Sequence, residues 1–141
     1  MRRATLAFGL MTSIALPALA GQGPWELLAA VEIDEVGDGD AWQAIKTFPP
    51  ELVAARDGFL ISGYAVPVTP EPYVQTFMLV EDQANCPFCG GDTYGPVLEV
   101  HLKRPAGDLK DFDAVTVSGQ LELIEDTGTY QSYRLVDAVI R

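Results

Sequence analysis

The sequence is poor in the side chains that carry most enzymatic chemistry. It has one histidine, His101, and two cysteines, Cys86 and Cys89. A single histidine gives nucleophilic catalysis little support, because such sites pair a nucleophile with a base that a third group orients. A closed structural zinc site needs four ligands, and the sequence has no second C-x-x-C pair. The composition therefore favours a non-enzymatic protein.

Basic residues are also scarce. The chain has 9 lysines and arginines against 20 aspartates and glutamates, a net charge of −11. Such a charge argues against nucleic acid and anionic membrane surfaces as partners. It suits a soluble exported protein and it attracts cations.

Residues 1 to 20 have the features of a secretory signal peptide. Arg2 and Arg3 precede an apolar run from Leu6 to Leu16, and Ala18-Leu19-Ala20 is a small-x-small cleavage pattern. The apolar run is too short for a membrane span, which needs about 20 residues. We therefore expect cleavage after Ala20, a periplasmic location, and no membrane insertion of the mature protein.

The mature chain divides into two parts that we expect to form one domain. Residues 21–57 are expected to be a helical or irregular arm, with short helices over 25–31 and 49–55 that each begin near a proline. Residues 58–141 contain five apolar or alternating segments at hairpin-like spacing. They are 59–66, 75–80, 97–102, 114–124 and 133–140.

Two of these predicted strands contain an interior glycine, Gly63 and Gly119, which is typical of bends and bulges. The pattern predicts a mainly β protein with a small OB-like barrel of five antiparallel strands, preceded by the partly helical arm. A meander or sandwich is the alternative. A short helical turn is expected between the third and fourth strands, within 103–113.

The most informative segment is Cys86-Pro87-Phe88-Cys89-Gly90-Gly91. A thioredoxin-like site would need a helix after Cys86, and the two glycines and Pro96 disfavour one. The C-P-x-C-G form resembles a metal knuckle, in which proline shapes the turn and glycine permits positive φ. Two thiolates suit copper(I), or zinc held at an open or shared site.

Two readings of the cysteine pair do not involve a metal. In an oxidising compartment Cys86 and Cys89 can form a small structural disulfide. They can also cycle as a redox dithiol on a scaffold other than thioredoxin. The sequence leaves the metal site, the disulfide and the dithiol open.

Further metal ligands would come from His101, from nearby carboxylates such as Asp92 or Glu99, from water, or from a second subunit in a dimer. Alternation along 97–103 puts Leu98, Val100 and Leu102 on one face of the strand. His101 is therefore expected to point away from the core, beside Glu99. A solvated strand histidine is the other interpretation of this residue.

The order of several short motifs resembles a family of small exported bacterial proteins of unknown function. The motifs are Trp25-x-x-Leu28, Phe48-Pro49-x-x-Leu52, Gly58-x-x-Ile61-x-Gly63-Tyr64-x-Val66-Pro67, Phe77-x-Leu79-Val80, Cys86-x-x-Cys89 and Val97-x-x-Val100. Many members carry a C-x-H-C loop and a proline run, both of which this chain lacks. The resemblance implies a role beside envelope transport systems, in metal handling.

Overall fold

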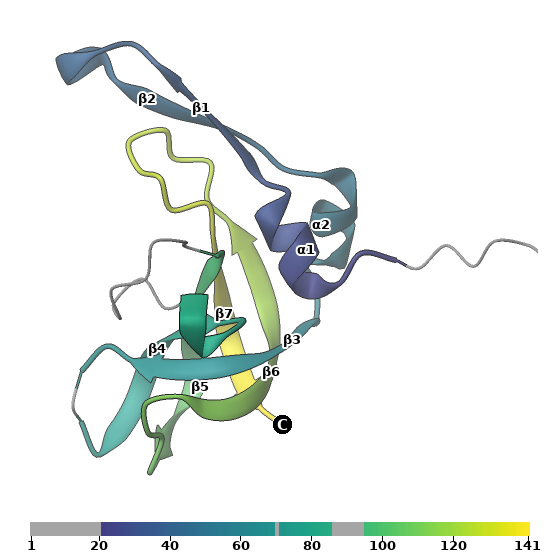
Figure 1. Cartoon of the computed structure of the whole chain (residues 1–141), viewed down its shortest axis with the longest axis vertical. Helices are drawn as coiled ribbons and strands as arrows, with labels where there is room; N and C mark the ends of the chain where they lie inside the picture. The colour runs from purple at the N-terminus through teal and green to yellow at the C-terminus, as the bar shows by residue number, and fades with distance from the viewer. Residues whose placement is uncertain (1–20, 70, 86–94) are drawn as a thin grey trace, which may run out of the picture.

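The computed structural model describes residues 21–69, 71–85 and 95–141. A closed barrel makes up most of it, and an N-terminal arm stands on one end of the barrel (Figure 1). The predicted signal peptide, Cys86, Cys89 and Asp92 lie outside the described residues.

The arm is a helix, a hairpin and a second helix. Helix α1 spans Pro24–Ala29 and helix α2 spans Pro50–Ala55, each with proline in its first turn. Strands β1 (Glu32–Val36) and β2 (Gln43–Thr47) pair antiparallel, and a short 3-10 helix, η1 (Gly39–Ala41), lies in the turn between them. The hairpin projects beyond the barrel (Figure 1).

The sequence-based expectation of a helical or irregular arm is wrong for the hairpin. The apolar residues of β1, Ile33 and Val36, lie three positions apart, so its sequence lacks the alternation that indicates a strand, and every residue of β1 is exposed. Gly37 and Gly39, both with positive φ, lie in the hairpin turn. Gly37 has a φ of 78°, and a Cβ there would lie 2.2 Å from the Ala41 carbonyl oxygen, so the turn requires glycine.

Five strands close the barrel in the order β3-β4-β5-β7-β6. They are β3 (Phe59–Pro67), β4 (Tyr73–Val80), β5 (Val97–Gly107), β6 (Asp113–Leu123) and β7 (Tyr133–Ile140). A second 3-10 helix, η2 (Gln83–Asn85), follows β4. All five predicted strands are present, and the mainly β fold class is confirmed.

The barrel is mixed, so the prediction of an antiparallel barrel is wrong in part. Strand β5 pairs parallel to β7, with Val100 opposite Leu135, and the other neighbouring pairs are antiparallel. The reason is that the number of strands is odd. Strands that alternate in direction around a closed ring must be even in number, so a ring of five contains at least one parallel pair.

Alternate residues of each strand fill the barrel. Leu98, Val100 and Leu102 are buried, as the alternation predicted, and they meet Phe77 and Leu79 of the neighbouring strand. The same hydrophobic cluster includes Trp25, Leu27, Leu28 and Leu52 of the arm. Arm and barrel therefore share one core.

The two interior strand glycines lie where other backbone comes close. A Cβ on Gly63 would lie 2.5 Å from the Val80 carbonyl oxygen and 3.0 Å from the Trp25 ring. A Cβ on Gly119 would lie 2.7 Å from the Val136 carbonyl oxygen, at the point where the β6–β7 register shifts. At Gly119 the register shift agrees with the predicted irregularity, whereas at Gly63 the pairing with β6 continues without a shift, and the glycine is required by the close approach of other atoms.

The expected helical turn within 103–113 is also wrong. Strand β5 continues to Gly107, opposite Tyr73, and a turn with positive φ at Asp108 and Phe112 leads into β6. Pro105 does not end the strand, because proline can lie within a strand where the pairing is irregular. Here it lies in an irregular stretch, where the β4–β5 register shifts between Val74 and Thr76.

Candidate functional site

A cleft of about 530 Å³ lies between the arm and one end of the barrel, and we call it the arm cleft. Its apolar wall includes Leu28, Val31, Ile33, Met78 and Val97. Its more polar wall includes Glu99, Tyr130, Gln131, Ser132 and Tyr133. The volume and the mixture of apolar surface with a few polar groups are typical of small binding sites.

Lys46 of β2 fixes one wall of the arm cleft. Its ammonium group donates to three main-chain carbonyl oxygens, those of Ile124 at 3.0 Å and of Asp126 and Gln131 at 2.7 Å. All three acceptors belong to the loop between β6 and β7. The Ala44 amide adds a 2.8 Å bond to the Thr127 carbonyl oxygen, so the hairpin and the loop are held together.

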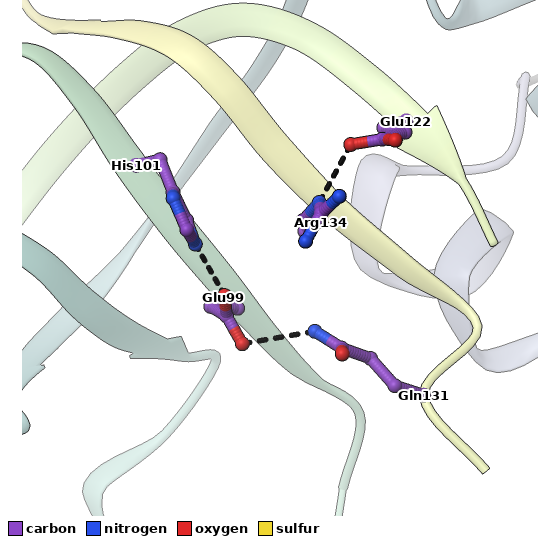
Figure 2. A network of polar contacts seen from close by, with 5 residues as sticks. All are labelled: Glu99, His101, Glu122, Gln131 and Arg134. Atoms are coloured by element: carbon purple, nitrogen blue, oxygen red, sulfur yellow. Dashed lines mark hydrogen bonds and ion pairs between the residues drawn. The ribbon is translucent and has the colours of Figure 1, made fainter. Parts of the chain in front are cut away.

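Glu99 links the wall to the outer face of β5. One of its carboxylate oxygens contacts Nε2 of His101, and the other accepts a 2.9 Å bond from the Gln131 side chain (Figure 2). The inward turn of Leu98 and Val100 places Glu99 and His101 together on the outer face. The predicted position of His101 beside Glu99 is confirmed.

Arg134 and Glu122 lie next to this group, on β7 and β6 (Figure 2). The parallel pairing of β5 and β7 sets Glu99 opposite Arg134, and Arg134 Nε donates to Glu122 at 2.6 Å. This hydrogen bond lowers the pKa of Glu122 and raises the pKa of Arg134. Because the pair is exposed, it contributes little to stability.

Aromatic side chains border the arm cleft. The rings of Trp42 and Tyr130 meet with centroids 4.8 Å apart at an angle of 55°. The Trp42 indole donates to Glu35 at 3.1 Å, and a hydrogen bond to Glu35 raises the pKa of Tyr130. Deeper in the wall, burial raises the pKa of Tyr133 to about 12, so this tyrosine stays neutral at physiological pH.

Of the predicted metal ligands, the structure places only His101 and Glu99. Cys86, Cys89 and Asp92 belong to the segment 86–94, which lies outside the described residues. His101 of β5 lies opposite Thr76 of β4, and the segment falls between these two strands in the sequence. Within 21–69, 71–85 and 95–141, no group of three or more histidine, cysteine, aspartate or glutamate side chains is arranged to hold a metal ion.

Sequence reasoning found Glu99 and His101 but missed their partners. Gln131 and Arg134 are distant from Glu99 in the sequence and meet it only because β7 lies beside β5. Lys46 was missed for the same reason, since its three acceptors lie in a loop some 80 residues later. A correct prediction of the parallel β5–β7 pair would have indicated Arg134.

Neither helix in the described ranges has the length and hydrophobicity needed to cross a membrane. No family model matches the chain, and searches of curated proteins and of solved structures found no significant match.

Proposed function

We propose that this chain is an exported, non-enzymatic binding module built on an OB-type barrel. The strand order supports this classification, because the third barrel strand lies parallel to the fifth and the other neighbours are antiparallel. OB-type barrels serve as binding scaffolds in which loops and appended elements vary. Export rests on the signal-like residues 1–20 and would place the module in the periplasm.

The ligand we propose is a thiophilic metal, zinc or copper, held by the thiolates of Cys86 and Cys89. The observation that carries this proposal is the sequence Cys86-Pro87-Phe88-Cys89-Gly90-Gly91, which has the composition of a metal knuckle. The described residues do not form a metal site by themselves. The proposal therefore depends on the two thiolates, with at most one or two ligands from elsewhere in the chain or from a second copy.

His101, Asp92 and Glu99 are the candidates for a further ligand. Glu99 lines the arm cleft together with Gly95 and Pro96, which directly follow the segment containing the cysteines. His101 would have to release the carboxylate of Glu99 from Nε2 to ligate a metal through that nitrogen. Binding by thiolates requires reduced cysteines and releases protons.

Two other functions follow from the same pair of cysteines. In the first, the chain is an adaptor in an envelope complex, such as a transport system, and Cys86–Cys89 is an inert disulfide. The projecting hairpin and the arm cleft favour this alternative, because the described residues leave both open to a partner. In the second, Cys86 and Cys89 form a dithiol that exchanges electrons with a redox partner.

Native mass spectrometry of the full chain, purified from the periplasm without chelator, tests the metal proposal. We expect one bound metal ion, whose mass identifies it, and its loss in Cys86→Ser. Lys103→Gln, at an exposed position on the same strand as His101, is the control and should retain metal. Metal that survives Cys86→Ser would overturn the proposal.

A second result would also overturn the metal proposal. The protein would be metal-free, would resist thiol alkylation and would be lighter by the mass of two hydrogens, which together indicate a disulfide. Its reduction potential would then separate the remaining functions. Structural disulfides of secreted proteins have potentials below about −300 mV, whereas catalytic dithiols range from about −270 to −120 mV.

A further inference from the structure

Strand β1 has a free edge in the described part of the chain. It pairs with β2 alone, in a two-stranded sheet that stands apart from the barrel sheet. The far edge of β2 is engaged, since the Ala44 amide donates to the Thr127 carbonyl oxygen. An extended chain can therefore join this sheet only beside β1. Unpaired strand edges are templates for such pairing.

The arm cleft lies next to this edge. Ile33 and Glu35 of β1 lie opposite Lys46 and Ala44 of β2, so all four side chains are on one face of the hairpin. Lys46 and Ala44 both donate hydrogen bonds to the loop before β7. Ile33 itself lines the cleft. We infer that a strand added to β1 would run along the mouth of the cleft, within reach of its apolar wall.

The charges around this edge select a basic occupant. Glu32, Asp34 and Glu35 are exposed on β1, and Glu99 lies in the cleft wall. The nearby cation of the hairpin, Lys46, is already engaged by three carbonyl oxygens. Tyr130 is 54% exposed at the cleft and offers an aromatic face on which a lysine or arginine can rest.

The same charges disfavour a second copy of the chain. A symmetric pair of β1 strands would bring the acidic side chains of one copy against those of the other, and like charges on facing strands destabilise a sheet. We propose that β1 and the arm cleft bind an extended basic segment of a partner protein, which adds a strand to the edge of β1. This docking does not depend on the role of Cys86 and Cys89.

Fluorescence anisotropy of the full mature chain with labelled peptides tests the proposal. The probe is an eight-residue peptide of alternating lysine and valine. One control peptide alternates lysine and proline, which keeps the charge but cannot pair as a strand. A second control alternates glutamate and valine. We expect only the lysine–valine peptide to bind, with an affinity that falls as salt is added.

A matched pair of variants locates the site. Asp34→Lys changes β1, whereas Asp111→Lys makes the same charge change in the exposed turn at the other end of the barrel. We expect Asp34→Lys to weaken binding at least tenfold and Asp111→Lys to change it by less than twofold. Hydrogen exchange of the β1 amides should slow when the peptide is bound.

Three results would overturn the proposal. Equal binding of the lysine–valine and lysine–proline peptides would show attraction by charge alone. Equal effects of Asp34→Lys and Asp111→Lys would place the peptide elsewhere. A dimer in sedimentation equilibrium that Asp34→Lys abolishes would identify a second copy of the chain as the occupant of the edge.

Discussion

Gln131 joins the arm to the barrel through two contacts made by different parts of the residue. Its carbonyl oxygen accepts from Lys46 of the hairpin at 2.7 Å, and its side chain donates to Glu99 of β5 at 2.9 Å. The wall of the arm cleft is thus a continuous chain of hydrogen bonds from β2 through the loop to β5. The shape of the cleft depends on this chain.

Replacement of Lys46 should loosen the hairpin. Lys46→Met keeps much of the aliphatic stem and removes three hydrogen bonds from a charged donor, so we expect a loss of about 1–3 kcal/mol in the free energy of unfolding. Urea unfolding measures the loss, and faster hydrogen exchange at the Ala44 amide would show that the hairpin has loosened. Lys103→Met, at an exposed position on β5, is the control and should change stability by less than about 0.5 kcal/mol.

Gly63 should tolerate no side chain. A methyl group there meets the Val80 carbonyl oxygen at 2.5 Å, and this backbone cannot move without opening the barrel. We expect Gly63→Ala to lower the free energy of unfolding by about 1–3 kcal/mol, as overpacking does. Gly107→Ala is the matched control in another strand, because its methyl group would only touch the Tyr73 ring at 3.7 Å. Equal melting temperatures for the two variants would contradict this account.

The barrel was predictable because each strand has local signals in the sequence. Alternation of buried and exposed residues marks β5, and Gly119 marks the irregularity in the pairing of β6 with β7. The hairpin was missed because the apolar residues of β1, Ile33 and Val36, lie three positions apart, so its sequence lacks the alternation of a strand. The parallel pair followed from geometry alone, since five strands in a closed ring cannot all alternate in direction.

The candidate site was predictable only within one strand. Glu99 and His101 are two residues apart, so their contact follows from the period of a β-strand. Lys46 and Gln131 meet through tertiary structure, and nothing near either residue in the sequence indicates the other. Long-range hydrogen bonds of this kind depend on the topology, which a local pattern does not contain.

Trp25 should contribute more to the free energy of unfolding than Trp42 does. The Trp25 indole donates to the Ser62 carbonyl oxygen at 2.8 Å in a buried position, whereas the Trp42 indole bonds to an exposed carboxylate. Trp25→Phe leaves that carbonyl without its donor, and we expect a loss of about 1–3 kcal/mol in the free energy of unfolding. Trp42→Phe is the same chemical change at a half-buried site, where only a hydrogen bond to an exposed carboxylate is lost, and should cost less than about 1 kcal/mol. Urea unfolding followed by circular dichroism compares them, and an equal loss would count against the role given to Trp25.

Tyr133 should make the protein sensitive to alkali. Burial raises its pKa to about 12 in the folded chain, whereas an unfolded tyrosine has a pKa near 10. Between these values the unfolded state loses a proton that the folded state keeps, so stability falls as pH rises. The full shift corresponds to roughly 2.7 kcal/mol, of which about half should be lost between pH 9 and pH 11.

Tyr133→Phe should remove that part of the pH dependence, since phenylalanine has no proton to release. The measurement is the free energy of unfolding in urea at pH 9 and pH 11 for the wild type and the variant. Tyr73→Phe, which alters an exposed tyrosine, is the control and should keep the wild-type decrease. An equally steep loss of stability with pH in Tyr133→Phe and Tyr73→Phe would contradict this prediction. It would mean that water reaches the phenol of Tyr133 in the folded chain, so the hydrogen bonds around Gln131 would not close the wall of the arm cleft.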